Sequence, residues 1–439
     1  MPLRIQLIQT LGTVRGSETI LQKSAPPLGL LSIATYLQAH DDGLEVEVLD
    51  GAVCPLDEIK QRIDADVVGF STTLWNYPTT LELAHAAKER GATVVMGGHH
   101  ASMVARNIIR NRSCVDYAVV GDGEVPMVKL LAGTPAAEIP GLVHREGGQV
   151  VANPTVKFDL NTYPIPQRSF VDMTPYFENY RNGMPDSPFD HFATVYSHKG
   201  CTYKMQYGPC IFCGIANPDY RVRNPSLVWE ELSYLYERYG ISYVMDAGDN
   251  LSKPWLKRFV ACNPHRHPCS FTSYIRSSEV DEEYADLLKA LDCYSVFVGI
   301  ESGDPARLSA ANKGTTPQTN ERAARILAER GIKLRLGIVL NMPGETEHSL
   351  LRTADHVKRL LDVGNIEGLS CAHLVPLPGS RAFAALSKGG SRRAAVDTED
   401  CFNPGNLEAE WCDVFTEVAY ERSLEVQCHI RSLAPPVCQ

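Results

Sequence analysis

Short apolar runs alternate with amphipathic stretches over about the first 150 residues of the chain. The runs are rich in β-branched residues and apolar on both faces, as strands buried in a parallel sheet are. They predict strands at 3–8, 44–49, 66–72, 92–96 and 116–120. Apolar residues at helical spacing predict helices between them, at about 28–39, 78–90, 101–110 and 124–132. Repeated strand–helix units indicate an α/β fold with an open, doubly wound parallel sheet over residues 1–150.

Polar residues and glycines collect where three of these strands end, and in a doubly wound sheet ligands bind beyond the carboxyl ends of the strands. Glycine lets the backbone approach a large ligand closely, but a tight turn between strand and helix also uses it, so both interpretations stay open. The residues are Ser71, Thr72, Thr73 and Trp75 after the third strand, Gly97, Gly98 and His99 after the fourth, and Gly121, Gly123 and Glu124 after the fifth.

Residues 151–190 are rich in proline and weakly periodic, so we expect a linker between two domains. A second strand–helix series follows. Its strands are predicted at 193–197, 241–246, 269–275, 295–300, 333–340 and 369–375, and its clearest helices at 226–239, 317–330 and 347–363. Six successive units predict a partial (β/α)6 barrel over 191–380. A helix at 407–431 is predicted within a short helical C-terminal cap over 381–439.

Three cysteines follow the first strand of the second series. Cys201 and Cys210 are separated by eight residues, and Cys210 and Cys213 by two. Three thiolates on one loop can hold three corners of an iron–sulfur cluster and leave one iron open for another ligand. Active sites of such barrels lie at the carboxyl ends of the strands, where this loop begins. The placement therefore favours a cluster loop over three unrelated cysteines.

Composition and charge argue against several classes of partner and indicate where the protein is located. The chain of 439 residues has a net charge of −10 and no basic run, so nucleic acid and anionic membranes are poor candidates as partners. The first residues lack the apolar segment of a signal peptide, and no apolar run approaches the ~20 residues of a spanning helix. We expect a cytoplasmic protein whose 13 cysteines are reduced, so clustered cysteines indicate metal rather than disulfides.

Other metal-ligand types are weaker candidates. Cys262, His265, His267 and Cys269 fall close together, but on a proline-containing turn at the opposite end of the predicted barrel. His198, beside the cysteine loop, is a candidate proton donor, although we expect it at the surface. The late cysteines match no ferredoxin-like spacing and are expected to be buried or idle thiols. They are Cys371, Cys401, Cys412, Cys428 and Cys438.

Together these features resemble the radical SAM superfamily, and specifically its subgroup with a cobalamin-binding domain, over almost the whole chain. The cysteine loop and the strand-end residues occur in the order of that family. The closing pair of cysteines with Phe212 between them is the family's usual one. The family's usual first gap is shorter than the eight residues found here, so the loop must bulge, and its contacts with adenine are in question.

The resemblance implies a [4Fe–4S] cluster on Cys201, Cys210 and Cys213, whose open iron binds S-adenosylmethionine (SAM). An electron from an external donor of flavodoxin or ferredoxin type then lets the cluster cleave a carbon–sulfur bond of SAM, usually giving a 5′-deoxyadenosyl radical. The SAM-binding residues that it implies are Phe212, Asp246, Arg276, Glu301, Ser302 and Asn341.

The resemblance also implies cobalamin, held by the strand-end residues of the first domain named above. The sequence has no Asp-x-His-x-x-Gly pattern to supply a histidine to cobalt, and the subgroup generally lacks this histidine. Trp75 lies on the loop that passes beneath the corrin ring in this subgroup, where its size would leave cobalt without a ligand from that side. Packing of Trp75 between the domains, and a domain retained without its cofactor, remain alternatives.

The resemblance therefore implies an enzyme of natural product biosynthesis that uses cobalamin to methylate an unactivated carbon or phosphorus of a small molecule or peptide precursor. The long cysteine gap keeps a second hypothesis open. It is a radical SAM enzyme of the same fold that performs a rearrangement, a ring contraction or transfer of another SAM fragment. A third is a non-catalytic cobalamin or cluster sensor, which would not cleave SAM when reduced.

Overall fold

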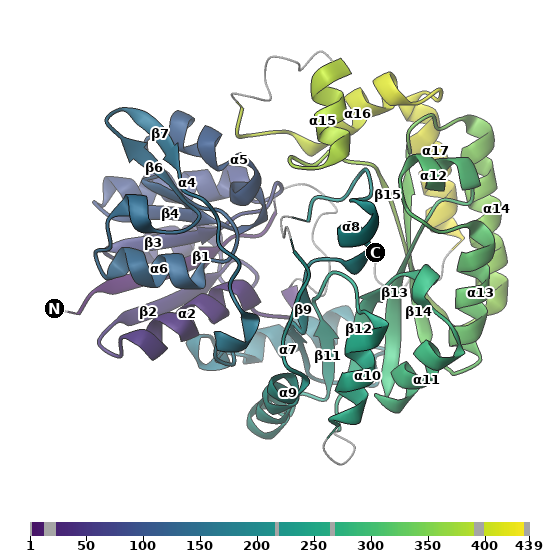
Figure 1. Ribbon diagram of the computed structural model, residues 1–439, viewed down its shortest axis with the longest axis horizontal. Helices are drawn as coiled ribbons and strands as arrows, with labels where there is room; N and C mark the ends of the chain where they lie inside the picture. The colour runs from purple at the N-terminus through teal and green to yellow at the C-terminus, as the bar shows by residue number, and fades with distance from the viewer. Residues whose placement is uncertain (1, 13–22, 216–218, 264–267, 390–398, 434–439) are drawn as a thin grey trace. The chain divides into compact units, whose positions relative to one another are not determined.

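The computed structural model of the protein describes residues 2–12, 23–215, 219–263, 268–389 and 399–433 (Figure 1). The chain divides into two compact units. Unit 1 comprises Met1–Ser187 and Ala394–Phe402, and unit 2 comprises Pro188–Arg393 and Asn403–Gln439. A short segment from the far end of the sequence therefore belongs to unit 1.

Unit 1 is built on a seven-stranded sheet in the order β2-β1-β3-β4-β5-β6-β7. Strands β1 to β5 are parallel and the helices between them are in the predicted places, which confirms the doubly wound sheet. The strands are β1 (Arg4–Gln9), β2 (Glu45–Asp50), β3 (Val67–Ser71), β4 (Thr93–Gly97), β5 (Tyr117–Val119), β6 (Leu142–Glu146) and β7 (Gln149–Ala152). The helices are α2 (Leu28–His40), α3 (Leu56–Arg62), α4 (Tyr77–Glu89), α5 (Gly98–Asn111), α6 (Glu124–Leu131) and α7 (Thr174–Gly183).

Four elements of unit 1, two strands and two helices, are not among the predicted ones. Strands β6 and β7 form an antiparallel hairpin whose turn is Gly147 and Gly148, both with positive φ, and this pair of glycines is a hairpin signal in the sequence. Helix α3 is short. Helix α7 lies in the segment 151–190, and its Tyr176 and Tyr180 are fully buried in unit 1.

Unit 2 contains a six-stranded parallel sheet in the order β15-β14-β13-β12-β11-β8, which confirms the partial barrel. Figure 1 shows its helices around the outside of these strands. The strands are β8 (Phe192–Val195), β11 (Tyr243–Asp246), β12 (Ser270–Ile275), β13 (Cys293–Glu301), β14 (Lys333–Leu340) and β15 (Ile366–His373). The helices are α9 (Pro225–Tyr239), α10 (Lys253–Ala261), α11 (Glu282–Ala290), α12 (Pro305–Ala310), α13 (Pro317–Ala328) and α14 (Glu347–Val363). A separate antiparallel pair, β9 (His198–Lys199) and β10 (Arg221–Val222), flanks the cysteine loop.

The C-terminal part of unit 2 is helical, as predicted, but the single helix expected at 407–431 is wrong. Two helices, α16 (Pro404–Phe415) and α17 (Tyr420–Ser432), follow α15 (Arg381–Gly389). The break has a tertiary cause, because the backbone N–H of Glu417 donates to the carbonyl of Glu345 instead of continuing the helix. Within the described part of the chain, no helix is both long and apolar enough to cross a membrane.

Candidate active site

The cysteine gap of eight residues is largely folded. Six of the residues between Cys201 and Cys210 form helix α8 (Thr202–Tyr207). The side-chain amide of Asn312 donates to three successive carbonyl oxygens, those of residues 207–209, at 3.1 to 3.3 Å. The extra residues therefore form a helix followed by a turn. Asn312 holds this turn by hydrogen bonds, and the turn leads to Cys210.

The three thiols of the loop fit an iron–sulfur cluster. None of them is in a disulfide. Burial raises the pKa of the Cys213 thiol to about 11, and the charges of Cys210 and Cys201 act in the same direction, so the three sulfurs share one space. Among the described residues no three His, Cys, Asp or Glu side chains converge as a single metal ion requires, whereas a four-iron cluster is larger and spreads its thiolate ligands. Cluster binding would stabilise the thiolate form, which burial disfavours at Cys213.

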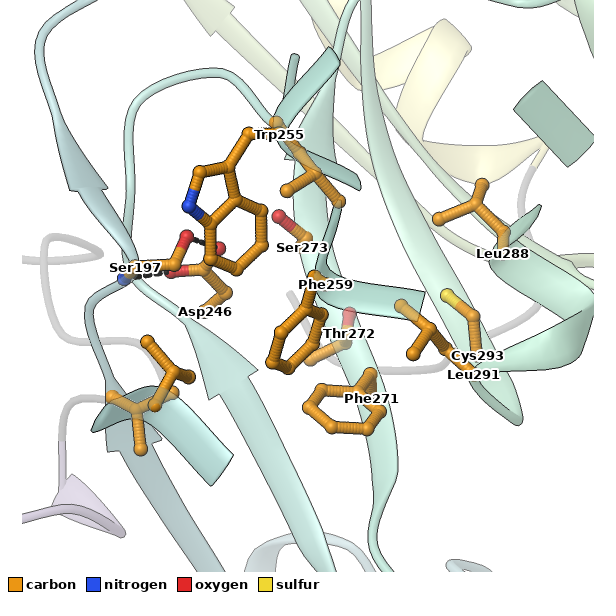
Figure 2. Close-up of a pocket in the computed structure, with 13 residues that line it drawn as sticks. Ser197, Asp246, Trp255, Phe259, Phe271, Thr272, Ser273, Leu288, Leu291 and Cys293 are labelled. Atoms are coloured by element: carbon orange, nitrogen blue, oxygen red, sulfur yellow. Dashed lines mark hydrogen bonds between the residues drawn. The ribbon is translucent and has the colours of Figure 1, made fainter. Parts of the chain in front are cut away.

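A buried network fixes the start of the cysteine loop. Asp246 accepts hydrogen bonds from the backbone N–H of Ser197, at 2.9 Å, and from the Ser197 hydroxyl (Figure 2). His198 contacts the same hydroxyl through Nδ1, at 2.8 Å, and accepts from the backbone N–H of Asn250 through Nε2. The prediction of a surface histidine is wrong, because His198 is only 1% exposed. Asp246 thus fixes the start of the cysteine loop through Ser197. Its contact with SAM stays a prediction.

Of two further predicted SAM residues, Arg276 lies against this loop and Phe212 belongs to it. The Arg276 guanidinium is stacked on Tyr203 of α8, 3.8 Å from the ring centroid, and its Nη1 lies 3.9 Å from the Cys210 sulfur. The Phe212 ring lies beneath the ammonium group of Lys313, which is 5.9 Å from its centroid. Both side chains are therefore near the cysteines, as the sequence suggests.

Glu301 ends β13 in an unusual conformation. Its φ is +63°, which non-glycine residues rarely adopt and which often marks a functional site. Its carboxylate is buried and pairs with Lys313 at 2.7 Å. A buried pair of opposite charges can present both an acceptor and a donor to a zwitterionic ligand, so the pair fits the amino acid end of SAM.

Ser302 and Asn341 differ in whether their side chains have a hydrogen-bonding group left for a ligand. The Ser302 hydroxyl already bonds Thr353, at 3.1 Å, and accepts from the backbone of Asp304. Asn341 has a φ of +63° and is fully buried; its Oδ1 accepts from Ser423, but its Nδ2 has no partner. A buried donor without an acceptor costs free energy, so this amide is suited to a ligand.

In unit 1, the loops after β3 and β4 are locked to each other. The Thr72 hydroxyl donates to the carbonyl of Gly97, and the Thr72 carbonyl accepts from the backbone N–H of His100. Gly98 has a φ of +91°, and a Cβ there would lie 2.6 Å from the Thr72 nitrogen. Glycine is therefore required at 98 for the close approach of two loops, whether or not a ligand binds there.

The other residues predicted to bind cobalamin also lie at strand ends. Trp75 is half-buried and His99 is exposed. The Glu124 carboxylate is buried and accepts from Ser32, at 2.7 Å. Their contacts with cobalamin stay predictions, as do those of the remaining members of the set, which are Ser71, Thr73, Gly121 and Gly123.

Sequence reasoning missed Asp400, which belongs to unit 1. Its buried carboxylate accepts from the Tyr77 hydroxyl, at 2.5 Å, and from Arg112 through two nitrogens, at 2.6 and 3.1 Å. Its backbone carbonyl lies 2.7 Å from Nε2 of His100. We call residues 399–402 the strap, because Asp400 joins the start of α4, at Tyr77, to both ends of α5, at His100 and Arg112. These two helices follow predicted cobalamin loops. No local pattern marks Asp400, which lies 300 residues from His100.

The weaker metal candidates gain no support among the described residues. His265 and His267 lie outside them, Cys262 is exposed and Cys269 is buried. Of the late cysteines, Cys371 and Cys412 are buried, Cys401 and Cys428 are exposed, and Cys438 lies outside the described residues.

Two cavities of unit 2 adjoin the site. The one in Figure 2 is only about 20 Å³, room for one water at most, and lies between the sheet and helices α9 to α11. Its lining is mostly apolar but includes the polar side chains of Ser197, Asp246, Thr272 and Ser273. The other is about 710 Å³. It is bordered by α8, by Arg276 and Ser278 after β12, and by Arg258 of α10.

Known proteins resemble the chain in both parts. Residues 21–131 match the B12 binding domain, and residues 195–357 match the radical SAM superfamily. An uncharacterized methyltransferase of Pyrococcus horikoshii is 27% identical over 382 residues, 83% of this chain and 79% of that protein. An anaerobic magnesium-protoporphyrin IX monomethyl ester cyclase of Synechocystis is 24% identical over 71% of this chain and 64% of its own length.

A solved structure agrees in fold. The radical SAM methyltransferase TsrM of Kitasatospora setae, with cobalamin and a [4Fe–4S] cluster bound, superposes with a TM-score of 0.72 at 20% identity, over 99% of this chain and 90% of that one. The three cofactors expected from the sequence, a [4Fe–4S] cluster, SAM and cobalamin, are those typical of proteins that combine the two matched domains.

Proposed function

We propose a methyl-transfer reaction for this chain, which is a radical SAM enzyme with an N-terminal B12-binding domain. The acceptor is an unactivated carbon or a phosphorus of a small molecule or peptide precursor. The observation that carries the proposal is the loop of three free thiols at the end of β8, in a chain that also has the B12-binding domain. The methyltransferase relative, similar over 83% of the chain, supports this choice of reaction.

Different residues of the chain bind the cluster and SAM. Cys201, Cys210 and Cys213 bind the cluster. The buried pair of Glu301 and Lys313 and the unpartnered amide of Asn341 hold SAM. When bound, the cluster supplies the electron that cleaves SAM, and cobalamin carries the methyl group.

For a carbon acceptor, the proposal fixes the balance of reactants. One SAM gives up its methyl group and becomes S-adenosylhomocysteine. A second SAM takes one electron, yields methionine, and leaves as 5′-deoxyadenosine after taking a hydrogen atom from the substrate. Two electrons from an external reductant are consumed for each methyl group transferred. Equal amounts of S-adenosylhomocysteine and 5′-deoxyadenosine are the signature of this balance.

The test is anaerobic reconstitution of the full chain, followed by mass spectrometry of SAM products with and without cobalamin. We expect reductant-dependent 5′-deoxyadenosine, and S-adenosylhomocysteine only when cobalamin is present. Cys201→Ala should lose both products, and Cys428→Ala, at an exposed cysteine of α17, should lose neither. Full SAM cleavage by Cys201→Ala would contradict the ligand assignment, and failure to take up cobalamin would contradict methyl transfer.

A second candidate is a reaction of the same radical SAM centre that transfers no methyl group. The cyclase relative of Synechocystis, whose name describes ring formation, favours keeping it. It predicts 5′-deoxyadenosine without S-adenosylhomocysteine, so the same measurement separates the two candidates.

A further inference from the structure

Helix α8, the extra length of the cysteine loop, carries a side chain that reaches the cluster site through Arg276. Tyr203 of α8 covers the guanidinium of Arg276, 3.8 Å from the ring centroid, which is a cation–π contact. On the far side, Arg276 approaches the Cys210 sulfur with Nη1, at 3.9 Å, and donates to the Lys313 carbonyl with Nη2. Arg276 therefore joins the cysteine loop, through Tyr203 and Cys210, to the segment that carries Lys313.

The guanidinium is held rather than free to move. Arg276 is 7% exposed, and its Nε is buried without a partner. Tyr203 in turn packs onto Gly314, where a Cβ would collide with the tyrosine ring. Gly314 has a φ of +66°, so a glycine suits this position in both conformation and space. The stack thus fixes a positive charge beside one cluster ligand.

We propose that Arg276 is a positioning residue that raises the reduction potential of the cluster, and that the eight-residue gap exists to hold it through Tyr203. The inference rests on the proposed cluster assignment of Cys210. Hydrogen bonds to the sulfurs and the surrounding charge set the potential of such clusters. Reduction adds one electron, supplied by the external donor, so a cation beside the Cys210 sulfur stabilises the reduced form more than the oxidised one.

This role differs from the one that the sequence predicts for Arg276, which is to bind SAM. A SAM ligand would affect SAM affinity and leave the potential unchanged when SAM is absent. A merely structural residue would affect cluster content and leave the potential of the retained clusters unchanged. The midpoint potential without SAM therefore separates the three roles.

The experiment is a mediated redox titration of the anaerobically reconstituted full chain without SAM, followed by electron paramagnetic resonance. For Arg276→Gln we expect at least tenfold less reduced cluster at a fixed potential, which is about 59 mV for one electron. Tyr203→Leu, which frees the guanidinium, should move the potential in the same direction by less. Arg258→Gln, on α10 in the wall of the same cavity, is the control and should leave the potential unchanged.

Each outcome decides the proposal. An unchanged potential in Arg276→Gln with a full iron content overturns it. Loss of the cluster from both Arg276→Gln and Tyr203→Leu also overturns it, since Arg276 would then serve cluster retention. A wild-type chain that takes up no cluster would instead contradict the proposed function, so the two failures are distinguishable.

Discussion

The two units fix their strand-end loops in different ways. In unit 2, the start of the cysteine loop is held by residues of two neighbouring strands, through the network of Ser197, His198 and Asp246. In unit 1, the corresponding loops are tied by Asp400, which comes from the far end of the chain. The cysteine loop is thus supported by neighbouring strands, whereas the helices after two of the predicted cobalamin loops are held by a residue distant in sequence.

The largest effect is expected from breaking the strap. Asp400→Asn removes a buried carboxylate from Arg112 and Tyr77, and the loss of one partner of such a pair costs about 3 kcal/mol. We expect unit 1 to unfold at a correspondingly lower urea concentration and to bind cobalamin more weakly. Asp413→Asn, at an exposed position of α16, is the matched control. Unchanged unfolding of Asp400→Asn would show that the strap is not a support.

A smaller effect is expected from the local network of unit 2. Ser197→Ala leaves Asp246 and His198 without their shared hydroxyl, at a cost of about 2 kcal/mol. Because the cysteine loop begins here, the variant should retain less iron per chain, with little effect on cobalamin uptake. Ser278→Ala, an exposed serine on another strand-end loop, should behave as wild type. Equal loss of iron and cobalamin from Ser197→Ala would contradict the separate support of the two loops.

The smallest effect concerns pH. Burial raises the pKa of Glu345 to about 7, despite hydrogen bonds from Ser349 and the backbone of Met342. A raised pKa means that this carboxyl contributes stability at low pH and loses it as the pH rises through 7. Glu345→Gln, whose side chain does not titrate, should show a smaller fall in the free energy of unfolding between pH 5 and 8 than the wild type does. Urea unfolding at the two pH values checks this. The same change in the free energy of unfolding between pH 5 and 8 in wild type and variant would rule it out.

Asp400 should respond to pH in the opposite direction. Burial alone would raise the pKa of Asp400, but hydrogen bonds from Arg112 and Tyr77 outweigh it and hold the pKa below its usual value. The ionised Asp400 therefore adds to the free energy of unfolding at neutral pH, and this stabilisation is lost as the pH falls through the lowered pKa. This contrast provides a second way to tell the two regions apart in unfolding curves.

The sequence predicts what depends on local pattern. The buried parallel strands and the cysteine loop after β8 follow from apolar runs and from the order of polar strand ends. Asp400 leaves no such trace, because its partners lie about 300 residues away and a single aspartate has no periodicity. The burial of His198 depends on its tertiary contacts with Asp246 and Asn250, which spacing cannot reveal. The hairpin turn at Gly147 and Gly148 did leave a readable signal.

The measurement that tests the proposed function most directly uses SAM with a deuterated methyl group. The full chain is reconstituted anaerobically with the cluster and cobalamin, reduced, and its cobalamin is extracted for mass spectrometry. We predict that the cobalamin carries the deuterated methyl group and that S-adenosylhomocysteine is released with it. Unlabelled cobalamin alongside abundant 5′-deoxyadenosine would contradict methyl transfer and leave a non-methylating radical SAM reaction.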